Sequence, residues 1–132
     1  MPKTRSAPTK GIRVTFSEQM WFIIEKWDTR NFYDDHIHNG APPSSYGSTY
    51  EGRLGLYHAF EAAKRSGTGY SMVVSPVVLD YLCDEFVPTA LDVIDGGGGE
   101  WEDRTGRSLW VGPISRFGTR MEALRVKVRA AQ

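Results

Sequence analysis

The sequence contains a single cysteine, Cys83, in 132 residues. One cysteine cannot form an internal disulfide, which argues against a small secreted scaffold held by disulfides. No window approaches 18 consecutive apolar residues, so the sequence predicts no transmembrane helix. Residues 1–11 contain no apolar run of the kind found in a signal peptide. We therefore expect a cytoplasmic protein that does not enter a membrane.

Signatures of catalysis are also lacking. There is no Gly-x-Ser-x-Gly elbow and no dinucleotide-binding fingerprint after a predicted strand. The four glycines at 96–99 are not followed by the Lys-Ser/Thr pair of a phosphate-binding loop. Cys83 falls on the apolar face of a predicted helix, where a cysteine behaves as a small hydrophobic residue. The sequence favours a non-enzymatic protein without a cofactor, although it leaves enzymatic activity open.

The apolar content is sufficient for one folded domain. Hydrophobic residues make up 40% and aromatic residues 12% of the chain, unlike the composition of a disordered protein. A chain of 132 residues is too short for two comfortable cores. Residues 1–11 carry bases and prolines but nothing to bury. We expect a flexible basic arm at 1–11 and a single globular domain at 12–132.

Local patterns predict the elements of the first part of the domain. In order, they are a strand at 12–16, a helix at 18–33, a loop at 34–49 and a helix at 50–66. Ser17 suits a helix N-cap because its hydroxyl can accept a hydrogen bond from a free backbone N–H. Gly67 suits the end of the second helix because glycine adopts left-handed backbone conformations without strain.

The second part begins with the same order of elements. A strand is predicted at 70–74, followed by a Ser75-Pro76 cap and a helix that Pro88 should kink or restart. Further strands are predicted at 108–111 and 121–130. The latter rests on the alternation of Leu124, Val126 and Val128 with bases, although helical spacing is also present in this segment.

The predicted fold is α+β, or α/β. About three helices cover one face of a small three- to four-stranded sheet, antiparallel or mixed. The two segments with the order strand, serine, helix share almost no residues, which argues against a true internal repeat.

The order of basic arm, strand, serine cap and helix over residues 3–33 resembles ribbon-helix-helix DNA-binding proteins. The resemblance covers a quarter of the chain. Trp21 and Phe22 at the helix start and the long loop before the second helix depart from that pattern. The sequence alone does not assign the chain to this family.

Charge is sorted along the chain although the net charge is +0. Residues 2–13 hold four bases and no acid, residues 80–103 hold eight acids and no base, and residues 104–132 hold seven bases and one acid. The candidate basic surface for a partner consists of Lys3, Arg5, Lys10, Arg13, Arg125, Lys127 and Arg129. Such bases could contact phosphates, protect an edge strand, or pair with the acidic segment inside the monomer.

Two further groups are candidates for binding. Trp21 and Phe32 lie beside the main apolar stripe of the first predicted helix, so they are either buried or available to a partner. The candidate ligands of a metal ion are Asp34, Asp35, His36, His38 and His58. The alternative is that the acids form a turn and that the histidines are ordinary polar residues.

Three hypotheses follow. The first is a binding or regulatory protein that contacts a protein partner, another copy of itself or a nucleic acid. The second is a metal-dependent hydrolase that uses the segment 34–38. The third is a subunit of a larger structural assembly, of the type found in phages or mobile elements.

Overall fold

The computed structural model describes residues 11–67, 69–95 and 104–131. In these ranges the only sheet has two strands, β1 (Ile12–Thr15) and β2 (Ser71–Val74), and the rest is mostly helical. The strands pair antiparallel, with Ile12 opposite Val74 and Thr15 opposite Ser71. The predicted α+β fold, with about three helices on a three- to four-stranded sheet, is therefore wrong, because the chain is mostly helical. The strands predicted at 12–16 and 70–74 are confirmed.

A helical rod follows β1 and is longer than predicted. It consists of α1 (Glu18–Ile24), the π-helical η1 (Glu25–Thr29), α2 (Arg30–Phe32) and the π-helical η2 (Tyr33–His38). Ser17 caps its start, because its Oγ accepts a hydrogen bond from the Met20 N–H at 3.2 Å. The rod ends at Asn39 and Gly40, where Gly40 has a φ of 78°. The predicted loop at 34–49 is thus helical in its first part and contains the 3-10 helix η3 (Pro43–Thr49).

The next helix, α3 (Tyr50–Ser66), has the predicted bounds and ends at Gly67 in a left-handed conformation. After β2, Ser75 caps a second rod by accepting from the Val78 N–H at 3.3 Å. This rod comprises α4 (Pro76–Tyr81), the π-helical η4 (Leu82–Phe86) and α5 (Val87–Asp95). The predicted kink or restart at Pro88 takes the form of a π segment that ends at Phe86, and helix α5 then runs through this proline, which has no N–H for the regular helical hydrogen bond.

The last element is the long helix α6 (Arg104–Ala130), so the strands predicted at 108–111 and 121–130 are wrong. The alternating residues near 125 gave a misleading strand signal. Helical spacing prevails because it turns Met121 into the core and places Leu124 and Val128 against it. No third strand joins β1 and β2 in the described chain.

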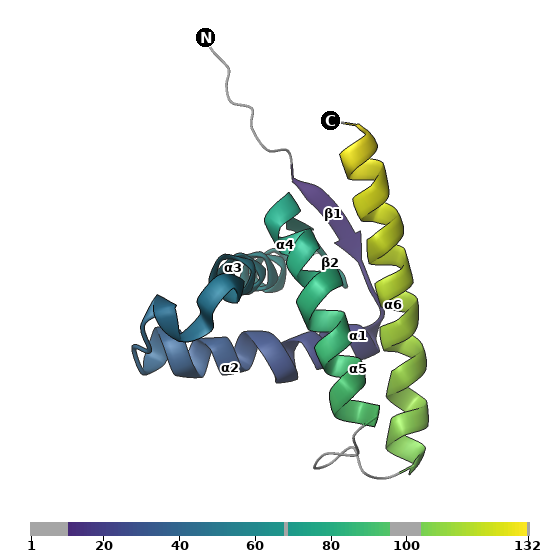
Figure 1. Cartoon of the computed structure of the whole chain (residues 1–132), viewed down its shortest axis with the longest axis horizontal. Helices are drawn as coiled ribbons and strands as arrows, with labels where there is room; N and C mark the ends of the chain where they lie inside the picture. The colour runs from purple at the N-terminus through teal and green to yellow at the C-terminus, as the bar shows by residue number, and fades with distance from the viewer. Residues whose placement is uncertain (1–10, 68, 96–103, 132) are drawn as a thin grey trace.

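The two halves have the same element order and are interlocked. Each strand leads through a serine cap into a rod, and each rod is followed by one more helix. Helix α3 of the first half packs against β2 and α4, while α6 of the second half packs against α1 as well as α4 and α5. In Figure 1, α6 runs along the β1 side of the ribbon. The two halves thus share an order of elements, although almost no residues match between them.

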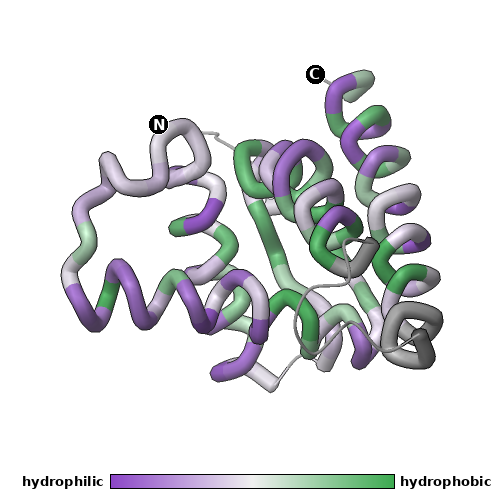
Figure 2. The backbone as a smooth tube through the Cα atoms, turned by 60° about the horizontal axis from the view of Figure 1, so that its bottom comes forward, coloured by the Kyte–Doolittle hydropathy of each residue, from purple (hydrophilic) through white to green (hydrophobic). Residues whose placement is uncertain are grey.

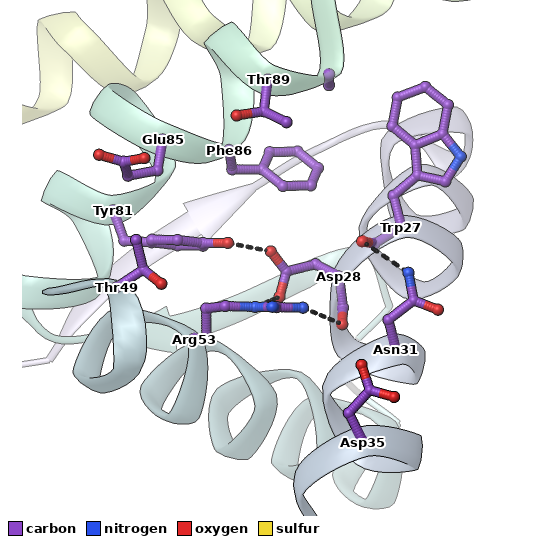
Figure 3. Close-up of a pocket in the computed structure, with 11 residues that line it drawn as sticks. Trp27, Asp28, Asn31, Asp35, Thr49, Arg53, Tyr81, Glu85, Phe86 and Thr89 are labelled. Carbon is purple, nitrogen blue, oxygen red and sulfur yellow. Dashed lines mark hydrogen bonds and ion pairs between the residues drawn. The ribbon is translucent and has the colours of Figure 1, made fainter. Parts of the chain in front are cut away.

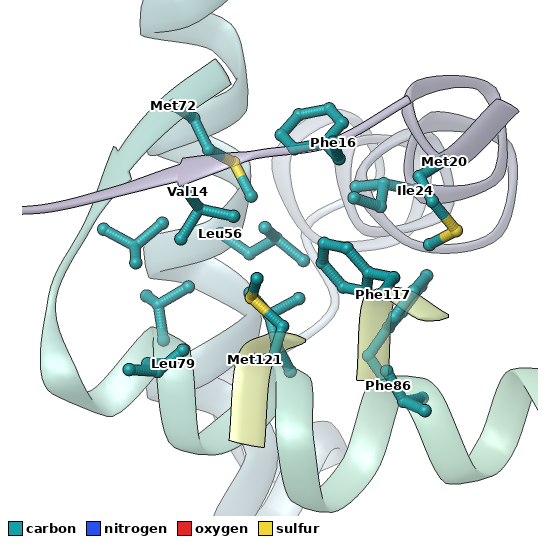
Figure 4. Close-up of a cluster of buried hydrophobic side chains, with 14 of the residues drawn as sticks. Val14, Phe16, Met20, Ile24, Leu56, Met72, Leu79, Phe86, Phe117 and Met121 are labelled. Atoms are coloured by element: carbon teal, nitrogen blue, oxygen red, sulfur yellow. The ribbon is translucent and has the colours of Figure 1, made fainter. Parts of the chain in front are cut away.

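The core lies under one face of the ribbon. Val14 and Met72 point inward and are buried, and Leu56, Phe117 and Met121 from the helices meet them (Figure 4). Hydrophobic positions gather on the strands and the helices beside them (Figure 2). Because strand side chains alternate between faces, this burial fixes which ribbon residues face outward.

Candidate functional site

The outer face of the two-stranded ribbon carries Arg13, Thr15, Ser71 and Val73. The exposed guanidinium of Arg13 donates a hydrogen bond to Ser71 Oγ at 3.0 Å, across the two strands. Val73 is an apolar residue that is 47% exposed. No acidic residue occurs in either strand. The outer face therefore combines a cation, hydroxyl groups and an apolar side chain.

Helix α6 adds bases beside this face. Arg120 is exposed, and its Nη2 donates to the Thr15 carbonyl oxygen at 2.8 Å. Arg116 lies one turn earlier on α6 and is also exposed. The sequence-predicted bases Lys3, Arg5 and Lys10 lie outside the described residues, and they precede β1 in the chain. Of the predicted basic set, Arg13 is thus the one placed on the ribbon.

Two other predicted bases are engaged with acids of the same chain. Arg125 pairs with Asp84 at 2.9 Å, Asp80 at 3.3 Å and Glu122 at 2.8 Å, and Arg129 pairs with Asp80 at 3.3 Å. Arg125 and Arg129 share a helix face because they are four residues apart. They therefore do not form the proposed strand surface, and the acidic and basic segments neutralise each other here. Lys127 is also exposed on α6.

The two aromatic candidates belong to the interior rather than to an open surface. Phe32 is fully buried, which makes it unavailable to a partner. Trp21 is half-buried, with its ring centroid 4.1 Å from that of Phe60 and 5.7 Å from that of Phe16. Both residues hold the first rod against its neighbours.

The predicted metal ligands are on two elements. Asp34, Asp35, His36 and His38 lie on η2, and His58 lies on α3. Both ring nitrogens of His36 are occupied, Nδ1 by the Ala41 carbonyl at 2.6 Å and Nε2 by the Tyr50 hydroxyl at 3.1 Å. Within the part of the chain that the structure describes, no three His, Cys, Asp or Glu side chains are grouped to hold a metal ion. The metal site stays a prediction that these positions do not support.

The sequence interpretation missed a buried carboxylate at Asp28, on η1, which is only 3% exposed. The Tyr81 hydroxyl of α4 donates to Asp28 Oδ2 at 2.5 Å, and Arg53 Nε of α3 lies 3.5 Å from Oδ1 (Figure 3). Arg53 Nη2 also donates to the Asp28 backbone carbonyl at 3.4 Å. This cluster joins both halves of the molecule.

Burial dominates the electrostatics of this cluster. It raises the pKa of Asp28 above the ordinary value, while the hydrogen bond from Tyr81 and the charge of Arg53 oppose that rise. Burial and the Asp28 carboxylate both raise the pKa of Tyr81, so its hydroxyl stays a donor. The Arg53 guanidinium also lies 5.5 Å from the Phe32 ring centroid and 5.2 Å from that of Tyr46, where cation–π attraction holds it.

A cavity of about 390 Å³ adjoins the cluster. Besides Asp28, Arg53 and Tyr81, its lining includes Trp27, Asn31, Asp35, Thr49, Glu85, Phe86, Thr89 and Ala90. These residues come from the first rod, from α3 and its start, and from the second rod. No signal for this site is present in the sequence, because Asp28 stands among the charged residues Glu25, Lys26 and Arg30, like an ordinary surface residue.

The cysteine has no catalytic surroundings. Cys83 is buried among the apolar side chains of the core, and burial raises its pKa to about 11. A neutral buried thiol is a poor nucleophile.

None of the helices in the described ranges combines the length and the apolar character needed to cross a bilayer. Comparison with known proteins finds no match among family models, curated proteins or solved structures. The geometry of the ribbon and of the cavity is therefore the basis on which a function can be inferred.

Proposed function

We propose that this protein is a non-enzymatic DNA-binding protein that places the outer face of the β1–β2 ribbon in the major groove. The observation that carries the proposal is the outer face itself, with Arg13, Thr15, Ser71 and Val73 on a two-stranded antiparallel ribbon. The major groove of B-DNA is wide enough for such a ribbon, and known β-ribbon proteins use it in this way.

The side chains on this face suit the edges of base pairs. An arginine can donate two hydrogen bonds to O6 and N7 of guanine, and hydroxyls can donate or accept at several bases. Val73 offers the apolar contact that a thymine methyl group prefers. Arg13 has five N–H donors, so its bond to Ser71 leaves donors for a base or a phosphate.

Contacts to phosphates would come from the sides of the ribbon. Arg120 of α6 is exposed and contacts the Thr15 end of β1, Arg116 is exposed one turn earlier on the same helix, and three bases precede β1 in the sequence. Because the net charge of the chain is +0, this attraction is local rather than a property of the whole surface. We therefore expect binding that weakens steeply as salt is added.

Fluorescence anisotropy with a labelled mixed-sequence DNA duplex tests the proposal. The full chain should bind at about 50 mM salt and lose most of its affinity at about 200 mM. Arg13→Glu should lower the affinity about tenfold or more, because it loses a base or phosphate contact and adds repulsion. Arg120→Glu should have a smaller effect of the same sign.

Arg30→Glu is the matched control because it makes the same change of charge at an exposed position of α2. Arg30 lies about 18 Å along the rod from its start at the ribbon. Duplex RNA is a second control, because its deep and narrow major groove does not admit the ribbon. Absence of DNA binding at low salt would exclude the proposal, as would equal losses in the Arg13 and Arg30 variants.

A further inference from the structure

We propose that the cavity beside Asp28 binds a small organic cation, an ammonium or guanidinium group attached to an apolar body. This inference does not depend on DNA binding, because the cavity and the ribbon share no residue. It follows from the charges that remain at the cavity, the rings in its wall and its position between the two halves.

The charges around the cavity do not balance. Asp28 and Arg53 compensate each other, so they contribute no free charge. Asp35 and Glu85 also line the cavity and are exposed. Neither has an ion-pair partner within the described ranges. The lining therefore keeps two negative charges without a cation to match them.

The wall of the cavity near these carboxylates is aromatic. The Trp27 and Phe86 side chains border the same space as Glu85 and Asp28 (Figure 3). An aromatic face attracts a cation through its quadrupole and also buries an apolar body. Carboxylates and rings lining one cavity thus suit a ligand that is both cationic and apolar.

The cavity disfavours anions and neutral apolar molecules. An anion would meet three lining carboxylates and one guanidinium that is already engaged with Asp28. A neutral apolar molecule would displace water from Asp35 and Glu85 without replacing its hydrogen bonds. The volume of about 390 Å³ falls within the range of small-molecule sites and limits the ligand to a compact one.

An NMR titration of the full chain tests this inference with three probes of similar shape. They are phenethylammonium, phenethyl alcohol and 3-phenylpropionate, which differ in charge. We expect the cation to bind about tenfold more tightly than the alcohol, and the anion more weakly than either. Amide shifts should centre on Asn31, Asp35, Glu85 and Thr89. No binding of the cation at millimolar concentration, equal affinities for the three probes, or shifts centred elsewhere would each overturn the proposal.

Variants then connect binding to the carboxylates. Glu85→Gln and Asp35→Asn should each lower the affinity for the cation about threefold to tenfold, and the double variant should lower it further. Asp34→Asn is the matched control, because this exposed neighbour of Asp35 does not line the cavity. Thermal unfolding should show that all variants remain folded, since the substituted side chains are exposed. Unchanged affinity in the folded double variant would contradict the proposal.

Discussion

Each half of the molecule joins its rod to its second helix with an ion pair, but the two pairs have opposite surroundings. In the first half, Asp28 and Arg53 meet in the interior, with the aspartate 3% exposed. In the second half, Arg125 meets Asp80 and Asp84 at the surface, where the acidic side chains are 47% and 57% exposed. The first half also has a surface pair between Glu25 and Lys64 at 3.0 Å. The contrast is therefore between the buried Asp28–Arg53 pair and pairs that water reaches.

The difference teaches what each contact can tolerate. A buried carboxylate must keep its partners, because the unpaired charge has no water to solvate it. An exposed acid that loses its partner is hydrated again, so the loss is small. The buried pair adjoins the cavity of about 390 Å³, while Asp80 and Asp84 of the exposed network line a smaller one of about 220 Å³. Four substitutions or titrations probe this contrast, from the largest expected effect to the smallest.

Arg53→Met should destabilise the protein by about 3–5 kcal/mol, because it leaves the Asp28 carboxylate buried and unpaired. Urea unfolding measures this loss. The double variant Asp28→Asn/Arg53→Met should recover much of the stability, since it removes the uncompensated charge. A loss below 1 kcal/mol for Arg53→Met, of the size of an exposed pair, would show that the contrast between the halves is wrong.

Gly52→Ala should destabilise the protein by about 1–2 kcal/mol, although alanine favours helices over glycine. A Cβ at this position would lie 2.5 Å from the Tyr81 Cβ, so α3 and α4 would have to separate at the residue that donates to Asp28. Gly112→Ala in α6 is the control, because its Cβ would meet only the mobile end of Arg116 at 3.1 Å. Thermal unfolding should rank the two in this order. Equal stability of both variants would contradict the close approach of the helices.

Arg125→Met should cost only about 1 kcal/mol, because Asp80, Asp84 and Glu122 remain accessible to water. This cost should shrink further in high salt, which screens exposed charges. Urea unfolding of the wild type and the variant at low and high salt measures both effects. A loss of stability as large as that of Arg53→Met, or one that salt does not change, would show that this network behaves like a buried pair.

The pH dependence of stability should differ between the wild type and Asp28→Asn. Burial raises the pKa of Asp28 above its usual 3.8, so the native state holds a proton that the unfolded chain has already released. The stabilisation that this bound proton provides is fully present below pH 3.8, and it is lost as the pH rises through the raised pKa of Asp28. The wild type should therefore lose stability relative to Asp28→Asn as the pH rises. Urea unfolding at a series of pH values checks this sign, and parallel curves for the two proteins would refute it.

Much of the chain up to the start of the second rod could be predicted because its signals are local. Ser17 and Ser75 cap helices where hydroxyls at strand ends suggested it, and α3 begins and ends as its spacing and Gly67 indicate. The C-terminal segment could not be read in this way, since the residues near Arg125 satisfy both a strand and a helix period. Packing of Met121 against the core decided between them, and that packing is not visible in a sequence window.

The sites were harder to predict than the elements. Arg13 remains a candidate because the predicted strand alternation placed it outward. For Arg125 and Arg129, pairing with the acidic segment was one of the alternatives, and the structure follows it. The Asp28 cluster could not be found, because its three members come from η1, α3 and α4, which meet only in the folded chain.

Both strands of the ribbon belong to one polypeptide, and this gives the outer face a direction. A ribbon formed by two copies of a chain would present the same residues twice, so it would contact its target in the same way in either orientation. Here Arg13 and Thr15 stand opposite Val73 and Ser71, so the two strands are chemically unlike. A target read by this face need not be palindromic, and the protein would sit on it in a single orientation. Formation of the ribbon is also intramolecular, so it does not depend on the concentration of the protein.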